Sequence, residues 1–133
     1  MNTIHNLLSF VTFRNSNAPP SSDSTPLEQV FEKSKTTPQF LWFFASYCGH
    51  CSRVYPEWHK LSQNIRNVDL RAIDCEKDRD KLLQFNNILR TKYKQEQITS
   101  FPTWYLVKNQ ELTLYDGERK ANDFEQWIMK RKN

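Results

Sequence analysis

The chain has 133 residues, a length that suits one domain with a hydrophobic core of its own. Apolar residues make up 38% of it and charged residues 26%, as in ordinary globular proteins, and no apolar run approaches the length of a membrane-spanning helix. The net charge of +4 is mild and spread along the chain, and three cysteines do not make a disulfide framework. We therefore expect neither a membrane nor a nucleic acid as a partner. We also expect the protein to be a monomer.

Residues 1–22 form an N-terminal extension. Within it, residues 7–13 fit a sheet strand, and the h-region of a signal peptide is the alternative, although no Lys or Arg precedes it. A polar connector with two prolines follows at residues 15–24. A helix is then predicted from Pro26, with a hydroxyl cap at Ser24 or Thr25, and it should end before Pro38.

The apolar run at residues 40–45 predicts a buried strand, and the residues from Ser52 to Ile65 predict a helix that Pro56 kinks. Between them lie Cys48 and Cys51. Two cysteines three apart at the first turn of a helix can bring their sulfurs within bonding distance. The first sulfur also lies beside free backbone N–H groups and the positive end of the helix dipole, which favour the nucleophilic thiolate.

The two residues between the cysteines fit the same chemistry. Gly49 leaves room for a partner to approach Cys48, and an imidazolium at His50 favours the thiolate further. Because a stabilised thiolate stabilises the dithiol over the disulfide, this site should be more oxidising than one with proline in place of His50.

Other uses of such a pair fit less well. A structural disulfide would close a very short loop and constrain the unfolded chain little. Zinc binding needs a second ligand pair, and covalent haem needs histidine where Ser52 stands. The pattern therefore predicts a redox site, with no metal and no cofactor.

A strand is predicted at residues 68–74, followed by a helix at 77–89 whose inward residues are Leu82, Leu83, Phe85 and Leu89. Cys75 at the strand end is expected to be a small buried residue, and a resolving or regulatory thiol is the alternative.

Residues 104–107 and 112–115 predict a hairpin, although its loop has no glycine. A last amphipathic helix should be capped by Asn122 or Asp123 and should bury Phe124, Trp127 and Ile128.

The stretch from Phe44 to Cys51, followed by Tyr55-Pro56-Glu57-Trp58-His59-Lys60, resembles the catalytic domain of protein disulfide isomerase. That domain carries an aromatic-Ala-x-Trp-Cys-Gly-His-Cys stretch and then Ala-Pro-Glu-aromatic-x-Lys. The resemblance implies an α/β thioredoxin fold, a central mixed β-sheet flanked by helices on both faces. The domain would span residues 23–133 and carry an insertion near 87–97, either a lengthened helix or a separate basic turn, which could touch a partner but is more simply a surface insertion.

The resemblance also implies roles for residues elsewhere. Ile98-Thr99-Ser100-Phe101-Pro102-Thr103 is similar to the family's Val-x-Gly-Tyr-Pro-Thr, whose proline follows a cis bond and faces the cysteines. Phe101 would then offer its backbone to a substrate strand. Arg119 matches an arginine that swings toward the second cysteine, and its plainer alternative is a surface pair with Asp116 or Glu118. The family's buried carboxylate, six residues before the first cysteine, is replaced by Trp42.

These residues together predict a thiol–disulfide oxidoreductase of the isomerase type. Cys48 would attack and Cys51 resolve. The protein would act on protein thiols and disulfides, with an upstream thiol oxidase or a reductase as redox partner. A cytosolic reductase and a weakly active interaction module stay open as alternatives. The expected site comprises Cys48, Cys51, His50, Gly49 and Arg119 as catalytic residues, with Phe101, Pro102 and Tyr47 in substrate binding.

Location is open at this stage. Without a clear signal peptide or a C-terminal retention signal, the cytoplasm of an organism or virus that makes disulfides there is the default. An oxidising secretory compartment is the alternative.

Overall fold

The computed structural model describes residues 17–132, so the expected N-terminal strand at 7–13 lies outside the described residues. A sheet of four strands runs in the order β2-β1-β3-β4. β1 pairs in parallel with β2 and antiparallel with β3, and β3 pairs antiparallel with β4. The strands are β1 (Gln39–Phe44), β2 (Asp69–Asp74), β3 (Thr103–Lys108) and β4 (Glu111–Leu114).

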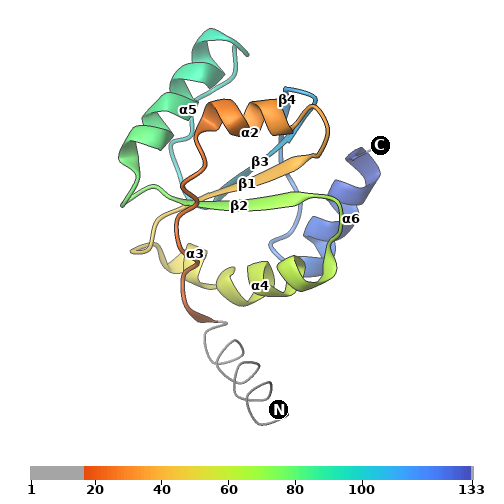
Figure 1. Cartoon of the computed structure of the whole chain (residues 1–133). Coiled ribbons are helices and arrows are strands. Elements are labelled where there is room, and N and C mark those ends of the chain that lie inside the picture. The colour runs from red at the N-terminus through yellow and green to blue at the C-terminus, as the bar shows by residue number, and fades with distance from the viewer. Residues whose placement is uncertain (1–16, 133) are drawn as a thin grey trace, which may run out of the picture.

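Helices cover both faces of this sheet (Figure 1). One face carries α2 (Leu27–Lys33) and α5 (Arg79–Thr91), and the other carries α3 (Gly49–Ser52), α4 (Tyr55–Asn64) and α6 (Ala121–Arg131). The predicted α/β thioredoxin fold, a mixed sheet between two helical layers, is confirmed. Within residues 17–132, no helix combines the length and the apolar character that crossing a membrane requires.

The central strand β1 is buried along its whole length. Phe40, Trp42 and Phe44 belong to the core under α4 and α6, whereas Leu41 and Phe43 belong to the core under α2 and α5. A strand covered on both faces reads as a continuous apolar run, which is why the sequence shows no alternation here. The chain leaves the carboxyl end of this rigid strand directly into the cysteine motif.

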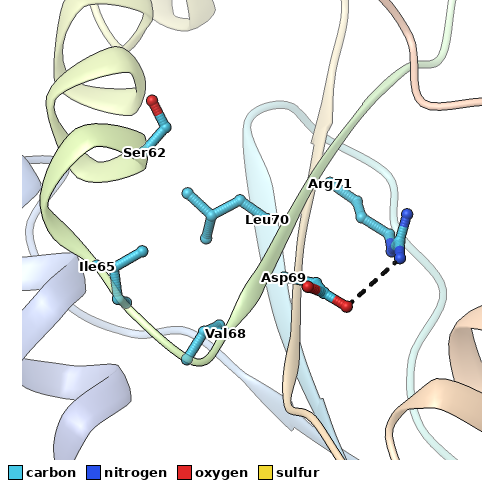
Figure 2. Close-up of a pocket in the computed structure, with 6 residues that line it drawn as sticks. All are labelled: Ser62, Ile65, Val68, Asp69, Leu70 and Arg71. Carbon is cyan, nitrogen blue, oxygen red and sulfur yellow. Dashed lines mark ion pairs between the residues drawn. The ribbon is translucent and has the colours of Figure 1, made fainter.

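The outer strand β2 shows the alternation that β1 lacks. Figure 2 shows Leu70 pointing toward α4 while Arg71 points to the opposite side, where its guanidinium pairs with Asp69 at 3.6 Å. Arg71 also pairs with Asp23 at 3.1 Å, and the Asp23 N–H donates to Ala72 at 2.7 Å. The pocket of Figure 2 lies between the end of α4 and the start of β2. It is therefore at the end of the sheet opposite the cysteines.

The helix after the cysteines is interrupted rather than kinked. α3 ends at Ser52, and α4 begins at Tyr55, so Pro56 is the second residue of a new helix. A proline there loses nothing, because the first N–H groups of a helix have no partner within it. The prediction of one continuous helix kinked at Pro56 is wrong.

Both predicted N-caps are also wrong. α2 begins after Pro26 without a side-chain cap, and the Thr25 hydroxyl instead accepts from Arg71 at 2.8 Å. α6 begins after Lys120, and its Ala121 N–H donates to Oε1 of Glu57 at 2.9 Å. A carboxylate from α4 thus replaces the cap expected from Asn122 or Asp123, and it fixes where α6 begins.

In α5 the inward face differs from the prediction. Phe85 and Leu89 are buried as expected, but Leu83 is 64% exposed. The buried position next to Phe85 belongs to Asn86, whose amide accepts from the Ile98 N–H at 2.7 Å and donates to the Ile98 carbonyl at 3.2 Å. A polar side chain occupies the core here because it pairs the backbone of the following loop.

The segment predicted as an insertion near 87–97 completes α5 to Thr91 and then turns back on the fold. The Tyr93 ring stacks on Phe31 of α2 with centroids 6.3 Å apart, and its hydroxyl donates to the Gln110 carbonyl. Asn109 and Gln110 both adopt positive φ, 49° and 66°, so the β3–β4 turn forms without glycine. Their N–H groups donate to Ser34, at 2.7 Å to its carbonyl and 2.9 Å to its hydroxyl.

Candidate active site

Cys48 stands where the chain leaves β1 and enters α3. It is the residue before the first helical turn, and its N–H donates to the Ala45 carbonyl at 3.0 Å. The Cys51 N–H donates to the Cys48 carbonyl at 3.1 Å, which closes the turn between the two cysteines. Both are free thiols, Cys48 partly exposed and Cys51 fully buried.

The surroundings of Cys48 favour its thiolate. Burial alone raises the pKa of Cys48, but the N–H of Cys51, the Cys51 thiol, the N–H of His50 and the Arg119 guanidinium outweigh it and hold the pKa below its ordinary value. Short-range hydrogen bonds thus contribute most of the lowering, and the four-residue α3 offers little macrodipole. The nucleophile expected from the sequence has the electrostatic setting that it needs.

Cys51 has the opposite setting. Burial raises its pKa to about 12, and the hydrogen bond to Cys48 and the charge of Cys48 add to this, although the Ala45 backbone and Arg119 oppose it. At pH 7 a thiol with that pKa is a thiolate in only about one molecule in 10⁵. The two sulfurs are therefore unequal: Cys48 is accessible and favours the thiolate, and Cys51 is buried and protonated.

The neighbours of the cysteines lie at the surface. Gly49 is exposed, and a Cβ placed there would meet nothing within 4 Å, which agrees with the open approach to Cys48. His50 is exposed and contributes its backbone N–H to the thiolate. Tyr47 is 72% exposed, the most exposed large apolar side chain of the described residues.

The loop before β3 comes against the same sulfur. The Phe101–Pro102 peptide bond is cis, and Pro102 is buried. The Cys48 thiol donates to the Phe101 carbonyl at a distance of 3.6 Å from sulfur to oxygen. Residues 53 positions apart in the sequence are thus brought together at one sulfur.

Arg119 lies on the loop between β4 and α6, within electrostatic range of both sulfurs. Its guanidinium lowers the pKa of Cys48 and opposes the rise at Cys51. Asp116, a partner considered for it, instead accepts from the indole N–H of Trp127 at 3.0 Å. Within the described part of the chain, Arg119 forms no ion pair, so its charge is available to the site.

Trp42 occupies the position of the family's buried carboxylate. It is fully buried, and its ring packs on four aromatic rings at centroid distances of 4.8–6.0 Å, those of Phe44, Tyr55, Trp58 and Trp104. Its indole N–H finds no partner among residues 17–132. An indole in place of a carboxylate cannot take a proton from Cys51.

Tyr55 is a site neighbour that the sequence analysis did not single out. Burial raises the pKa of Tyr55, and the charges of Cys51 and Asp74 raise it further, which places its hydroxyl within range of both. The signal was present, because Tyr55 stands where the family's motif has alanine. It makes the floor of the site aromatic at two positions, 42 and 55.

Cys75 follows the last residue of β2 and lies within electrostatic range of Cys51. It is buried, and its pKa is raised to about 12, first by burial and then by the charges of Asp74 and Asp78. Its thiol donates to the Ile73 carbonyl at 3.7 Å. This agrees with a small buried residue at a strand end.

With this geometry in view, the comparisons with known proteins agree on the family. The thioredoxin family model matches residues 23–130. The chain therefore belongs to the thioredoxin family. It is 32% identical over 116 residues to protein disulfide isomerase-like 2-3 of Oryza sativa, covering 83% of this chain and 24% of that protein. It is 30% identical over 93 residues to the protein disulfide-isomerase of Saccharomyces cerevisiae, covering 66% of this chain and 16% of that protein.

Solved structures agree on the fold. The X-ray structure of Fasciola hepatica thioredoxin matches with a TM-score of 0.59 at 21% identity, covering 80% of this chain and 91% of that chain. The first two thioredoxin domains of Naumovozyma dairenensis Eps1p match with a TM-score of 0.60 at 25% identity, covering 86% of this chain and 43% of that chain. The chain spans about a quarter or less of the length of the curated relatives reported above.

Proposed function

We propose that this chain exchanges disulfides with protein substrates as an oxidoreductase of the protein disulfide isomerase type. The inequality of the two sulfurs is the observation that carries the proposal. Cys48 is accessible with a lowered pKa, and Cys51 is buried with a pKa of about 12. A nucleophile must reach the substrate as a thiolate, whereas a resolving thiol must wait until a mixed disulfide has formed.

The reaction then proceeds in two exchanges. The Cys48 thiolate attacks one sulfur of a substrate disulfide, a Cys48–substrate bond forms, and the other substrate sulfur leaves as a thiolate. Cys51 next loses its proton and attacks the Cys48 sulfur, so that the Cys48–Cys51 disulfide forms and the second substrate thiolate leaves. The reverse sequence oxidises a substrate dithiol. Isomerisation results when a different substrate thiolate, rather than Cys51, displaces Cys48.

The residues around the pair have distinct parts in this proposal. The Phe101 backbone and the buried Pro102 would hold an extended substrate segment against Cys48, with the exposed Tyr47 at its side. Arg119 would help Cys51 to lose its proton, because its charge favours both thiolates. With Trp42 in place of a carboxylate, that proton must leave to solvent or to a neighbouring side chain, and the resolving step should be slow.

A trapping experiment tests these roles. The Cys51→Ala variant should accumulate mixed disulfides with a scrambled protein substrate under oxidising conditions, since the first exchange is intact and the second is lost. The Cys48→Ala variant should form none. Cys75→Ala is the matched control, because Cys75 is likewise a buried thiol with a raised pKa, and it should behave as the unmodified protein.

The reduction potential of the Cys48–Cys51 pair then shows whether the protein favours oxidation or reduction of its substrates. The Cys-Gly-His-Cys pair should lie nearer to about −180 mV, as in protein disulfide isomerase, than to about −270 mV, as in thioredoxin. A value near that of thioredoxin would favour a reductase. No mixed disulfide with Cys51→Ala, together with no refolding of scrambled substrate, would refute the proposed function.

A further inference from the structure

A pocket of about 360 Å³ opens beside the cysteine motif. One wall is His50 of α3 and Arg53 just after it. The other wall is the loop between β4 and α6, which contributes Glu118, Arg119 and Lys120. The pocket therefore lies between the end of α3 and the loop that leads into α6.

The pocket is basic. Arg53, Arg119 and Lys120 contribute three positive charges and Glu118 one negative charge, so the excess is two before His50 is considered. All of these side chains are exposed. In the part of the chain that the structure describes, none of the three basic side chains is in an ion pair.

An acidic group outside the lining, Glu57, is already occupied. Glu57 of α4 lies in electrostatic range of Lys120. Its Oε1 accepts from the Ala121 N–H at 2.9 Å, and its Oε2 pairs with Lys60 at 3.4 Å. The positive charge of the pocket is therefore not cancelled by the fold, and it stands free to attract an anionic group.

The pocket shares lining residues with a second pocket beside Pro102, where a substrate would lie. A neighbouring pocket of about 280 Å³ is lined by Pro102 and Leu114 and shares Gly117 and Arg119 with the basic pocket. A peptide held against Cys48 and Pro102 would thus extend past Arg119 into the basic pocket. Residues a few positions from the substrate cysteine would come to lie there.

We propose that this basic pocket selects protein substrates that carry Asp or Glu within a few residues of the reacting cysteine. The inference rests on the proposed function and deepens it, since it names the substrate class of the same site. Arg53 and Lys120 are the residues that would confer the preference, because they line the pocket without being part of the thiol chemistry. Arg119 would take part both in the substrate preference and in the thiol chemistry.

Three peptide disulfides that differ only in the residues flanking the cysteine, Glu, Gln or Lys, test the preference. At about 10 mM salt, where the screening length is about 30 Å, kcat/KM for the Glu peptide should exceed that for the Lys peptide about tenfold. At about 1 M salt, where the screening length is about 3 Å, the kcat/KM values for the Glu and Lys peptides should become equal. The kcat/KM for the uncharged Gln peptide should change little between the two salt concentrations.

Charge variants locate the effect. The double variant Arg53→Ala and Lys120→Ala should lose the preference for Glu while turning over the Gln peptide as before. The matched control is Lys33→Ala with Arg90→Ala, which removes one lysine and one arginine from exposed positions on α2 and α5, on the other face of the sheet. The control should keep the full preference. Equal kcat/KM for the Glu and Lys peptides at low salt, or a preference that survives in the double variant, would overturn the inference.

Binding without turnover separates this inference from the proposed function. The Glu peptide with Ser in place of its cysteine should perturb the amide resonances of Gly117 and Arg119 at low salt, and the Lys peptide should not. If no peptide disulfide is reduced but this binding is seen, the proposed thiol chemistry is wrong and the assignment of the basic pocket is retained. If reduction proceeds without any charge preference and without this binding, the pocket assignment fails and the chemistry stands.

Discussion

Glu57 is predicted to stabilise the fold at the junction of α4 and α6. Its Oε1 accepts the Ala121 N–H at 2.9 Å, and α6 has no side-chain cap of its own. The Glu57 side chain is 16% exposed, so this hydrogen bond is largely shielded from water. Its ion pair with Lys60 adds little, because the lysine is 63% exposed.

The magnitude follows from these contacts. Losing a helix cap costs about 1 kcal/mol, and losing a hydrogen bond to a charged acceptor costs about 1.5–3 kcal/mol. Since both describe the same contact, Glu57→Ala should lower the free energy of unfolding by about 2 kcal/mol, and Glu57→Gln, which keeps an acceptor oxygen, by about 1 kcal/mol. The melting temperature should fall by about 4 °C for each kcal/mol.

The pH dependence supplies a second signature. The Ala121 N–H is the main cause that holds the pKa of Glu57 below its unfolded value of 4.5. A depressed folded pKa gives stability that is present above the unfolded pKa and lost as pH falls through the folded pKa. The difference in unfolding free energy between the unmodified protein and Glu57→Gln should therefore be largest near pH 7 and shrink below pH 4.5.

Urea unfolding from pH 7 to pH 3 measures both effects. Glu32→Ala is the matched control, since Glu32 makes an ion pair with Lys35 at the same i,i+3 spacing, at 3.0 Å, but is exposed and caps nothing. It should cost less than about 0.5 kcal/mol. Equal losses for Glu57→Ala and Glu32→Ala, or a Glu57→Gln difference that does not vary with pH, would refute the capping argument.

Three further changes have defined outcomes. Phe85→Ala should lower the free energy of unfolding in urea by about 4 kcal/mol, because the ring is fully buried. Leu83→Ala should lower it by less than about 0.5 kcal/mol, because Leu83 is exposed. Similar losses for the two variants would contradict the orientation of α5. Gly117→Ala would place its methyl 2.5 Å from the Tyr115 hydroxyl, so it should lower the free energy of unfolding by about 1–3 kcal/mol. An unchanged urea midpoint would contradict that contact. Arg119→Ala should move the alkylation of the nucleophilic cysteine to higher pH, because a positive charge that favours the thiolate is removed, and an unshifted profile would exclude its role.

The fold could be predicted because local patterns and long-range packing agree in most of the chain. The continuous apolar run of β1 predicts a strand covered on both faces, and such a strand needs helices on each side. Cys48 at the end of β1 needs only local geometry to become the residue before a helical turn. The Phe101 carbonyl could be placed against Cys48 only through the resemblance to a known family, because no local pattern joins positions 53 residues apart.

The errors arose where distant residues decide local structure. The start of α6 is fixed by Glu57, 64 positions earlier in the chain, so a search for a cap near Asn122 could not find it. Asn86 is buried because it pairs the backbone of Ile98, and α5 turns Leu83 to solvent in consequence. Pro56 ended up at the beginning of a helix, a position that its sequence allows as readily as a kink.

Cys48 and Cys51 differ in their readiness to become thiolates, and the proposed function depends on that difference. Limiting alkylation of the fully reduced protein across a pH series, with each modified cysteine located by mass spectrometry, tests it directly. Cys48 should react first, with an apparent pKa below 9.0, while Cys51 and Cys75 stay unmodified until the protein unfolds. Alkylation of Cys51 at the same rate and pH as Cys48, or of neither below pH 9.0, would contradict the account.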